Sequence, residues 1–472
     1  MKRVLLILLI TTLNEFAFSQ QWFPLQDGLS GSDAQNNKVV SMCADTINHY
    51  LYVGGYFNQC HSDTGIIAVN NLARWDGNNW SAISLYSDTI FIGIGYGKTI
   101  TSMVLHNNEI YLTVSNDVSS IYGVFKFDVN TFQSSRIGYF NNSLNCLYFY
   151  EDTLYLGGAF TQWKQFTASS WQTGSGVLKW MGSGNQWQQV GGGIAVGGFS
   201  EVNALCVHHN KLYAAGIFET AGGTYCKNIA CWNDTSWSAV GSGIGFSGQF
   251  DCILHALVSY KNKLYAGGDF YMSDGYFANG LGMWNDTAWS ATGVNATAVY
   301  ALKVHGNKLY FGSDGSSLGT WLWDRVTCYD DSVWLSTGTG PTGDVLALEV
   351  FNNDLYAGGV FETIDSITNA GFIARYDPTI IQDTTSIIEV KQNEREINVY
   401  PNPANEYLTI QLLNNSLPNE IEIADAVGRV VMKTENRKLS IQINIKNLAA
   451  GLYFVKVYLQ DGEIQVRKFV KQ

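Results

Sequence analysis

The feature that most constrains this chain is a short pattern that recurs at regular spacing. A Leu or Ile followed by Tyr opens a strand-like run in the same local context seven times. The first residues of these pairs are Leu51, Ile110, Leu154, Leu212, Leu264, Leu309 and Leu355. Their mean spacing is about 51 residues, a period typical of propellers and solenoids. The pattern therefore predicts seven structural repeats.

Each repeat contains four strand-length apolar runs. They are clearest at residues 202–207, 212–218, 228–232 and 237–240. Each run is bounded by Gly, Asn, Asp or Ser and is too short for a globular helix. Four consecutive antiparallel strands are the plan of a propeller blade.

Small residues mark two positions in each repeat. A glycine pair with a nearby Phe follows most of the Tyr residues, as in Gly54-Gly55 with Phe57. Glycine weakens a strand unless another backbone approaches closely, and we expect packed neighbouring blades to supply that approach. A second small residue precedes each Leu-Tyr pair, which places the first strand at the crowded centre of a ring. This second column is Ser41, Ser102, Cys146, Ala204, Ala256, Ala301 and Ala347.

An aromatic pair closes each repeat except the last. Trp232 and Trp237, for example, bracket the turn residues Asn233-Asp234, which are typical of a hairpin. The seventh repeat has Tyr376 but no second Trp, whereas residues 21–28 near the N-terminus repeat the missing text. We therefore expect an all-β, seven-bladed β-propeller closed by an N-terminal strand, over residues 20–380.

The segments LYVGG and ARWDGNNW resemble the kelch or galactose-oxidase-like class of β-propeller, over residues 21–379. WD-repeat propellers are the alternative, but Trp-Asp occurs only at Trp75-Asp76 and, out of register, at Trp323-Asp324. Galactose oxidase holds copper with two tyrosines, two histidines and a cysteine-crosslinked tyrosine, and no positions here match that set. The resemblance thus implies the fold and not the activity.

Three histidines occupy one register and invite a metal hypothesis. His106, His208 and His305 each lie four residues before the Leu-Tyr pair, on different repeats. Because that position falls at a turn of a separate blade each time, we expect structural roles and no metal site from them.

The loops between the second and third strands carry the candidate binding residues, which should gather on one face. Their carboxylates could hold Ca²⁺, although their spacing has no ordered ligand pattern and favours a solvated surface. Polar or aromatic loop residues could equally bind a glycan or a protein. The acidic candidates are Asp63, Glu219, Asp274, Glu362 and Asp365.

The N-terminus predicts export. Lys2 and Arg3 precede the apolar run VLLILLI, and small residues precede Gln20, which is the pattern of a signal peptide over residues 1–19. A membrane anchor would need about 20 apolar residues. The formal net charge is −12, with the acidic excess in the repeats, so we expect no nucleic-acid partner.

Eight cysteines would pass through oxidising compartments. Their even number permits up to four disulfides, with Cys226 and Cys231 as a weak candidate pair. Several cysteines instead occupy strand positions that are small or apolar in other repeats, and for these we expect buried thiols.

The periodicity ends near residue 380 and a polar linker, residues 381–395, follows. Residues 396–472 then alternate as in a small antiparallel β-sandwich of the immunoglobulin-like kind. Their text closely resembles the type A C-terminal sorting domain of the type IX secretion system of Bacteroidota. The residues that carry this resemblance are Tyr400, Pro401, Asn402, Pro403, Gly428, Gly451, Leu452, Tyr453 and Lys468.

The resemblance implies a delivery route. The partners would be the type IX translocon and its sortase-like peptidase, with cleavage near residues 384–393 and the cargo secreted or attached at the cell surface. For the cargo itself we favour a non-enzymatic module that binds a glycan or a protein, without a cofactor other than a potential calcium ion. The alternative is a galactose-oxidase-like or other propeller enzyme that acts at the mouth of the channel.

Overall fold

The computed structural model contains two compact units, residues Met1–Ile381 and Gln382–Gln472. The signal-peptide prediction (residues 1–19), the linker and the expected cleavage segment all lie outside the described residues. The described residues are 22–32, 36–63, 65–85, 98–116, 122–165, 168, 170–195, 200–245, 252–270, 272–273, 276–277, 280–294, 296–315, 325–330, 334–338, 340–364, 367–368, 370–377, 397–412, 418–425, 429–435, 438–459 and 464–472.

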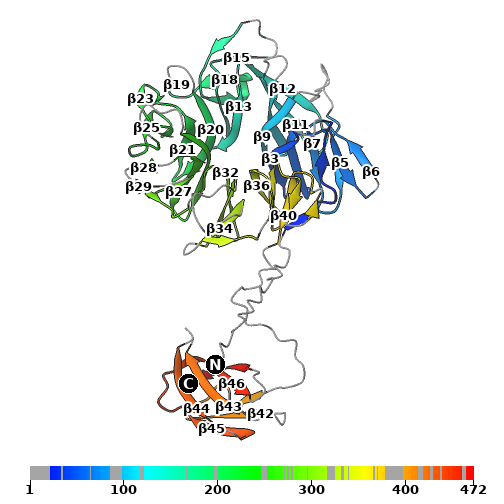
Figure 1. The fold of residues 1–472 in the computed structure, drawn as a ribbon. Helices are drawn as coiled ribbons and strands as arrows, with labels where there is room; N and C mark the ends of the chain where they lie inside the picture. Colours follow the sequence, from blue (N-terminus) through cyan, green and yellow to red (C-terminus); the bar gives the residue numbers. More distant parts are fainter. Residues whose placement is uncertain are drawn as a thin grey trace, which may run out of the picture. The chain divides into compact units, whose positions relative to one another are not determined.

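In the N-terminal unit, each repeat contributes one antiparallel sheet whose strands follow chain order (Figure 1). The first three are β3 (Lys38–Asp45), β4 (Tyr50–Tyr56), β7 (Leu72–Trp75) and β8 (Trp80–Ala82); β9 (Lys98–His106), β10 (Glu109–Asn116), β11 (Tyr122–Asp128) and β12 (Ser134–Phe140); and β13 (Leu144–Tyr150), β14 (Thr153–Gly158), β17 (Val177–Met181) and β18 (Gln186–Gln189).

The last four are β20 (Glu201–His208), β21 (Lys211–Ile217), β24 (Ile229–Trp232) and β25 (Trp237–Ala239); β26 (Ile253–Tyr260), β27 (Lys263–Asp269), β30 (Leu281–Trp284) and β31 (Trp289–Ala291); β32 (Val299–His305), β33 (Lys308–Ser313), β34 (Val326–Tyr329) and β35 (Trp334–Ser336); and β36 (Val345–Phe351), β37 (Asp354–Gly359), β40 (Ile373–Tyr376) and the N-terminal β1 (Trp22–Pro24). The four strands predicted between residues 202 and 240 are thus confirmed as β20, β21, β24 and β25.

Within the described residues, short hairpins extend five of the repeats between their second and third strands. They are β5 (Gln59–Ser62) with β6 (Gly65–Ala68), β15 (Gln162–Lys164) with β16 (Gln172–Thr173), β22 (Thr220–Ala221) with β23 (Thr224–Tyr225), β28 (Met272–Ser273) with β29 (Tyr276–Phe277), and β38 (Thr363–Ile364) with β39 (Ile367–Thr368). The strands β2 (Leu29–Ser30) and β19 (Ile194–Ala195) pair with β5 and β22, β15 pairs with β12, and a 3-10 turn covers Gly182–Gly184.

The first strands form the inner edges of the sheets. Each contacts the first strand of the next repeat, and β3 of the first repeat contacts β36 of the last. Figure 1 shows these strands facing the middle of the unit. The result is an all-β, propeller-like arrangement. No helix in the described part of the chain is long and apolar enough to cross a membrane.

A β-bulge recurs beside the small-residue column. In the fourth repeat, Val202 pairs with Gly216 and Ala204 pairs with Ala215. No residue of β21 therefore lies opposite Asn203 in the strand register. A register shift stands at the same place in all seven first strands. The bulge explains the second glycine of each pair, because a Cβ on Gly216 would lie 2.0 Å from the carbonyl oxygen of Glu201.

The first glycine of each pair is required by the packing of the neighbouring repeat. A Cβ on Gly267 would lie 2.6 Å from Cγ1 of Val299, on the first strand of the next repeat. The equivalent contact joins Gly358 of the last repeat to Cγ1 of Val39 in the first, at 2.3 Å. The close approach of neighbouring sheets that the sequence predicted is therefore confirmed for this position.

Tryptophan side chains connect the outer parts of the sheets. The two members of the closing pair lie opposite each other in six sheets, as Trp232 does with Trp237. In the second repeat Phe127 lies opposite Ser134 and not opposite Phe132. The second indole then donates its N–H to a carbonyl of the preceding repeat, at 2.9–3.1 Å. The donor and acceptor residues are Trp80 and Leu25, Trp187 and Ile137, Trp237 and Val190, Trp289 and Val240, Trp334 and Thr292, and Trp22 and Thr337.

The C-terminal unit is a small two-sheet β domain with its own core. One sheet has the order β41-β42-β45 and the other β44-β43-β46-β47. The core includes Ile410, Ile423, Val455 and Phe469, all nearly or fully buried. The strands are β41 (Ile397–Tyr400), β42 (Tyr407–Leu412), β43 (Pro418–Asp425), β44 (Val430–Glu435), β45 (Ser440–Asn444), β46 (Gly451–Leu459) and β47 (Ile464–Lys471).

Packing between repeats predicts the outcome of a single-atom test. We expect Gly267→Ala to lower the free energy of unfolding by about 1–3 kcal/mol, because the new Cβ overpacks against Val299. Gly182→Ala is the control, since nothing lies within 4 Å of its added Cβ, and it should change stability by less than about 0.5 kcal/mol. Urea unfolding followed by tryptophan fluorescence measures both. Equal effects of the two substitutions would contradict this account of the glycine.

Candidate functional site

The three acidic loop residues that the structure describes lie on separate repeats, and the structure does not bring them together. Asp63, Glu219 and Glu362 are each exposed, at or beside the hairpins between second and third strands. Asp274 and Asp365 lie outside the described residues. Within the described ranges, the one group of side chains that could share a metal ion contains none of these carboxylates. A calcium site in these loops therefore stays a prediction.

The same hairpins carry large exposed side chains. Ile66 on β6 is 63% exposed, Tyr225 on β23 is 54% exposed, and Trp171 beside β16 is 40% exposed. The ammonium group of Lys164 lies 5.0 Å from the centre of the Trp171 ring. Because antiparallel strands alternate in direction, every connection between second and third strands leaves its sheet at the end opposite the other two turns. These residues thus belong to one end of their sheets.

The bulges place a row of half-buried side chains along the inner edges of the sheets. Asn145 donates to the side-chain oxygen of Asn203 at 2.6 Å, and Asn203 donates to the Leu254 carbonyl at 3.1 Å. Farther along the row, the rings of His255 and Tyr300 lie 5.0 Å apart. Burial lowers the pKa of His255 to about 4, so its imidazole is neutral at physiological pH. The row thus presents polar side chains on four consecutive repeats.

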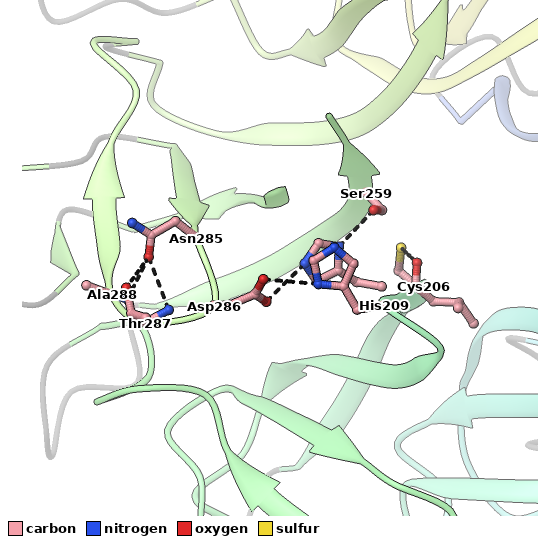
Figure 2. Close-up of polar contacts among 9 residues, drawn as sticks. Cys206, His209, Ser259, Asn285, Asp286, Thr287 and Ala288 are labelled. Atoms are coloured by element: carbon pink, nitrogen blue, oxygen red, sulfur yellow. Dashed lines mark hydrogen bonds and ion pairs between the residues drawn. The ribbon is translucent and has the colours of Figure 1, made fainter. Parts of the chain in front are cut away.

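A second cluster lies at the opposite end of the sheets, between the fourth and fifth repeats (Figure 2). Asp286, in the turn between β30 and β31, reaches two adjacent histidines at the turn between β20 and β21. Its Oδ1 lies 3.2 Å from Nε2 of His208, and its Oδ2 lies 3.0 Å from Nδ1 of His209. The two imidazole rings stack with their centres 4.0 Å apart.

The environments of the three side chains differ. The His208 side chain is fully buried, whereas those of His209 and Asp286 are 47% and 44% exposed. Burial is the main reason that the pKa of His208 is lowered, the neighbouring His209 lowers it further, and Asp286 opposes both effects. The buried imidazole therefore favours its neutral form.

The sequence placed His208 correctly but missed its partners. His106, His208 and His305 do lie on different repeats, so they do not meet one another. His209 and Asp286 lie outside the repeating histidine column, since His209 follows the column position and Asp286 belongs to the next repeat. A signal was present: the Asn-Asp-Thr turn recurs as Asn233-Asp234 and Asn285-Asp286, in register with each other.

The cysteines are structural thiols. All eight are free, so the weak candidate pair Cys226 and Cys231 forms no disulfide. Seven are buried and Cys146 is half-buried. Burial raises the pKa of Cys43, Cys206 and Cys252 to about 12, which disfavours the reactive thiolate.

The sorting residues of the C-terminal unit lie near its last strand, although Gly428 is outside the described residues. Asn402 follows β41; its side-chain oxygen accepts from the Val470 N–H at 2.9 Å, and its NH₂ donates to the Lys468 carbonyl at 3.3 Å. The Tyr453 ring stacks on Phe469 at 5.6 Å, next to Leu452, which is 41% exposed. Tyr400, Pro401, Pro403 and Lys468 are exposed, and Gly451 begins β46.

Residues 398–472 match a family model described as the secretion system C-terminal sorting domain. The C-terminal unit is a type IX sorting domain. A domain of this kind implies interaction with the type IX translocon and secretion or display at the cell surface. No curated protein matches the sequence.

Solved structures resemble the chain at low identity. A fungal alcohol oxidase of the AA5 family, in complex with copper, is 12% identical, with a TM-score of 0.45, over 96% of this chain and 99% of that one. The extracellular domain of a putative hybrid two-component system from B. thetaiotaomicron is 11% identical, with a TM-score of 0.34, over 94% and 76%. The β-propeller domain of the Trilobed protease from Pyrococcus furiosus is 10% identical, with a TM-score of 0.39, over 71% and 95%. Likenesses this distant carry no inference about activity.

Proposed function

We propose that the chain is a type IX cargo whose N-terminal unit is a closed seven-bladed propeller that binds a ligand outside the cell without chemical conversion. The observation that carries the binding role is the display of Ile66, Trp171 and Tyr225 on the hairpins at one end of the sheets. Exposed aromatic rings with a polar rim are the usual means of contacting a glycan or a protein surface.

Contacts of the N-terminal segment and of the innermost strands support ring closure. The N-terminal strand β1 pairs with β40, with Trp22 opposite Tyr376. The Trp22 indole is fully buried and donates to the Thr337 carbonyl of the sixth repeat. The innermost strands β3 and β36 also contact each other. At the boundary between the last and first repeats, the Trp80 indole donates to the Leu25 carbonyl just after β1, which repeats the contact found between consecutive repeats.

Closure predicts that the N-terminal strand stabilises the whole unit. We expect Trp22→Phe to lower the free energy of unfolding by about 1–2 kcal/mol, because the buried Thr337 carbonyl loses its donor. Trp171→Phe, at a partly exposed ring, should have little effect. Thermal and urea unfolding of the full chain measure both. If a chain that begins at Asn37 unfolds at the same temperature as the full chain, the ring is not closed by β1.

The binding role predicts which surface substitutions matter. With the purified full chain on an array of immobilised glycans, we expect Trp171→Ala and Tyr225→Ala to weaken binding roughly tenfold or more, since each removes a large contact ring. Ile47→Ala is the matched control, because Ile47 is 75% exposed but lies in the turn between β3 and β4, at the other end of the sheet. A chain that binds no glycan, or an Ile47→Ala variant that weakens binding equally, would contradict a glycan-binding face.

The delivery route predicts a separate phenotype. We infer that a signal peptide over residues 1–19 takes the chain across the inner membrane. The type IX peptidase then cleaves near residues 384–393, and the cargo is released or attached to surface lipopolysaccharide. A chain that ends at Ile381 should therefore accumulate in the periplasm of a type IX-competent host, while the full chain reaches the surface or medium in a shortened form. Cell fractionation and mass measurement test this, and export of the truncated chain would contradict it.

A further inference from the structure

We propose that His208, His209 and Asp286 form a binding site for a zinc ion that joins the fourth and fifth repeats. The site lies at the end of the sheets that carries the turns between first and second strands and between third and fourth strands (Figure 2). It is distinct from the hairpin face of the proposed function, and it does not depend on that function.

The spacing of the donor atoms suits a tetrahedral ion. With zinc–ligand bonds of 2.0–2.1 Å, the ligand atoms of a tetrahedral site lie about 3.3 Å apart. Here Oδ1 of Asp286 lies 3.2 Å from Nε2 of His208, and Oδ2, the other oxygen of the same carboxylate, lies 3.0 Å from Nδ1 of His209. One ligand atom from each of the three residues lies within 4.8 Å of the others. Small side-chain rotations would therefore admit the ion between them.

The surroundings hold the ligands in place. Nδ1 of His208 is 2.8 Å from the Ser259 hydroxyl, an outer-shell contact that fixes the imidazole and leaves Nε2 directed toward Asp286. The Asp286 turn is fixed by Asn285, whose side-chain oxygen accepts from the N–H groups of Thr287 and Ala288 at 3.1 and 2.9 Å (Figure 2). Both sides of the site are thus positioned before an ion arrives.

Another boundary between repeats supplies an internal comparison. Between the third and fourth repeats, the position of His208 is held by Tyr150, whose hydroxyl contacts Asp234 at 3.1 Å. Asp234 is the counterpart of Asp286, and the residue after Tyr150 is Glu151 where the fourth repeat has His209. At that turn a tyrosine hydroxyl supplies the contact to the carboxylate, without a nitrogen ligand. One side-chain contact to the carboxylate is therefore enough at such a boundary between repeats, and the second imidazole beside Asp286 needs another explanation.

The donor set selects the class of ion. Two imidazole nitrogens and one carboxylate oxygen suit zinc and neighbouring transition ions, whereas calcium and magnesium prefer oxygen donors throughout. His209 and Asp286 are each about half exposed, so a water molecule could complete the coordination. An ion here would link the turn between β20 and β21 to the turn between β30 and β31 at the surface.

The test is a titration of the full chain with Zn²⁺ alone by calorimetry, with Co²⁺ absorption as a second measure of coordination. His209→Asn and Asp286→Asn remove one ligand each and keep the turn. Asn is compatible with the left-handed backbone of His209 (φ 46°) and occupies the same register at Asn107 (φ 48°) and Asn352 (φ 49°). Asp234→Asn and His305→Asn are the controls, at the equivalent turn and at a histidine in the same register.

We expect one zinc ion per chain, a higher unfolding temperature with zinc, and a tetrahedral Co²⁺ spectrum. Affinity should fall at least about tenfold in His209→Asn and Asp286→Asn and stay unchanged in both controls. The unfolding temperatures without metal should match among the His209, His305 and Asp234 variants, which separates ligand loss from misfolding. The proposal is wrong if the native chain binds no zinc, or if the controls lose affinity as much as the ligand variants do.

Discussion

The hydrogen bond from a buried indole N–H to the carbonyl of the preceding repeat is the interaction on which the N-terminal unit depends most. A repeat of four short strands has too little core to be stable alone, so its faces must be covered by its neighbours. The indole covers apolar surface and satisfies a main-chain acceptor at once. Six such contacts involve the described residues. In the second repeat Ser134 lies opposite Phe127, at the register position of the donor. The Phe132 ring, in the turn before it, lies under the Arg74 guanidinium at 5.1 Å.

Much of this arrangement could be predicted because every repeat must cover its faces with its neighbours and uses the same residue types at the same positions to do so. The Leu-Tyr pairs, the small column and the paired aromatics fixed the strands, their order and their hairpin turns. The second glycine was harder to explain from sequence. Gly216 is required because the sheet that bulges at Asn203 holds the Glu201 carbonyl close to it, and the bulge does not alter the local periodicity. Sequence patterns describe what each strand presents, and a bulge changes which atoms face each other without changing the pattern.

The candidate sites, in contrast to the strands, could not be predicted from the repeating pattern. His208 and Asp286 are 78 residues apart, and their contact follows from the placement of two repeats rather than from any motif. The acidic loop residues were plausible ligands by composition, yet Asp63, Glu219 and Glu362 lie on three different repeats. Conversely, the sorting motif was recognisable because its residues act within one small domain, where Asn402 and Val470 meet through the packing of adjacent strands. Function that lies between repeats is therefore visible only in three dimensions.

The pairing of β1 with β40 has a consequence for the order of events during biogenesis. The seventh sheet takes one strand from the beginning of the unit and three from its end, so it cannot be assembled until nearly the whole unit has emerged. Contacts between such distant segments form late, because the intervening loop must close first. Until then the aromatic faces that β1 covers stay accessible, so the two ends of the unit must meet before its last core is closed to water.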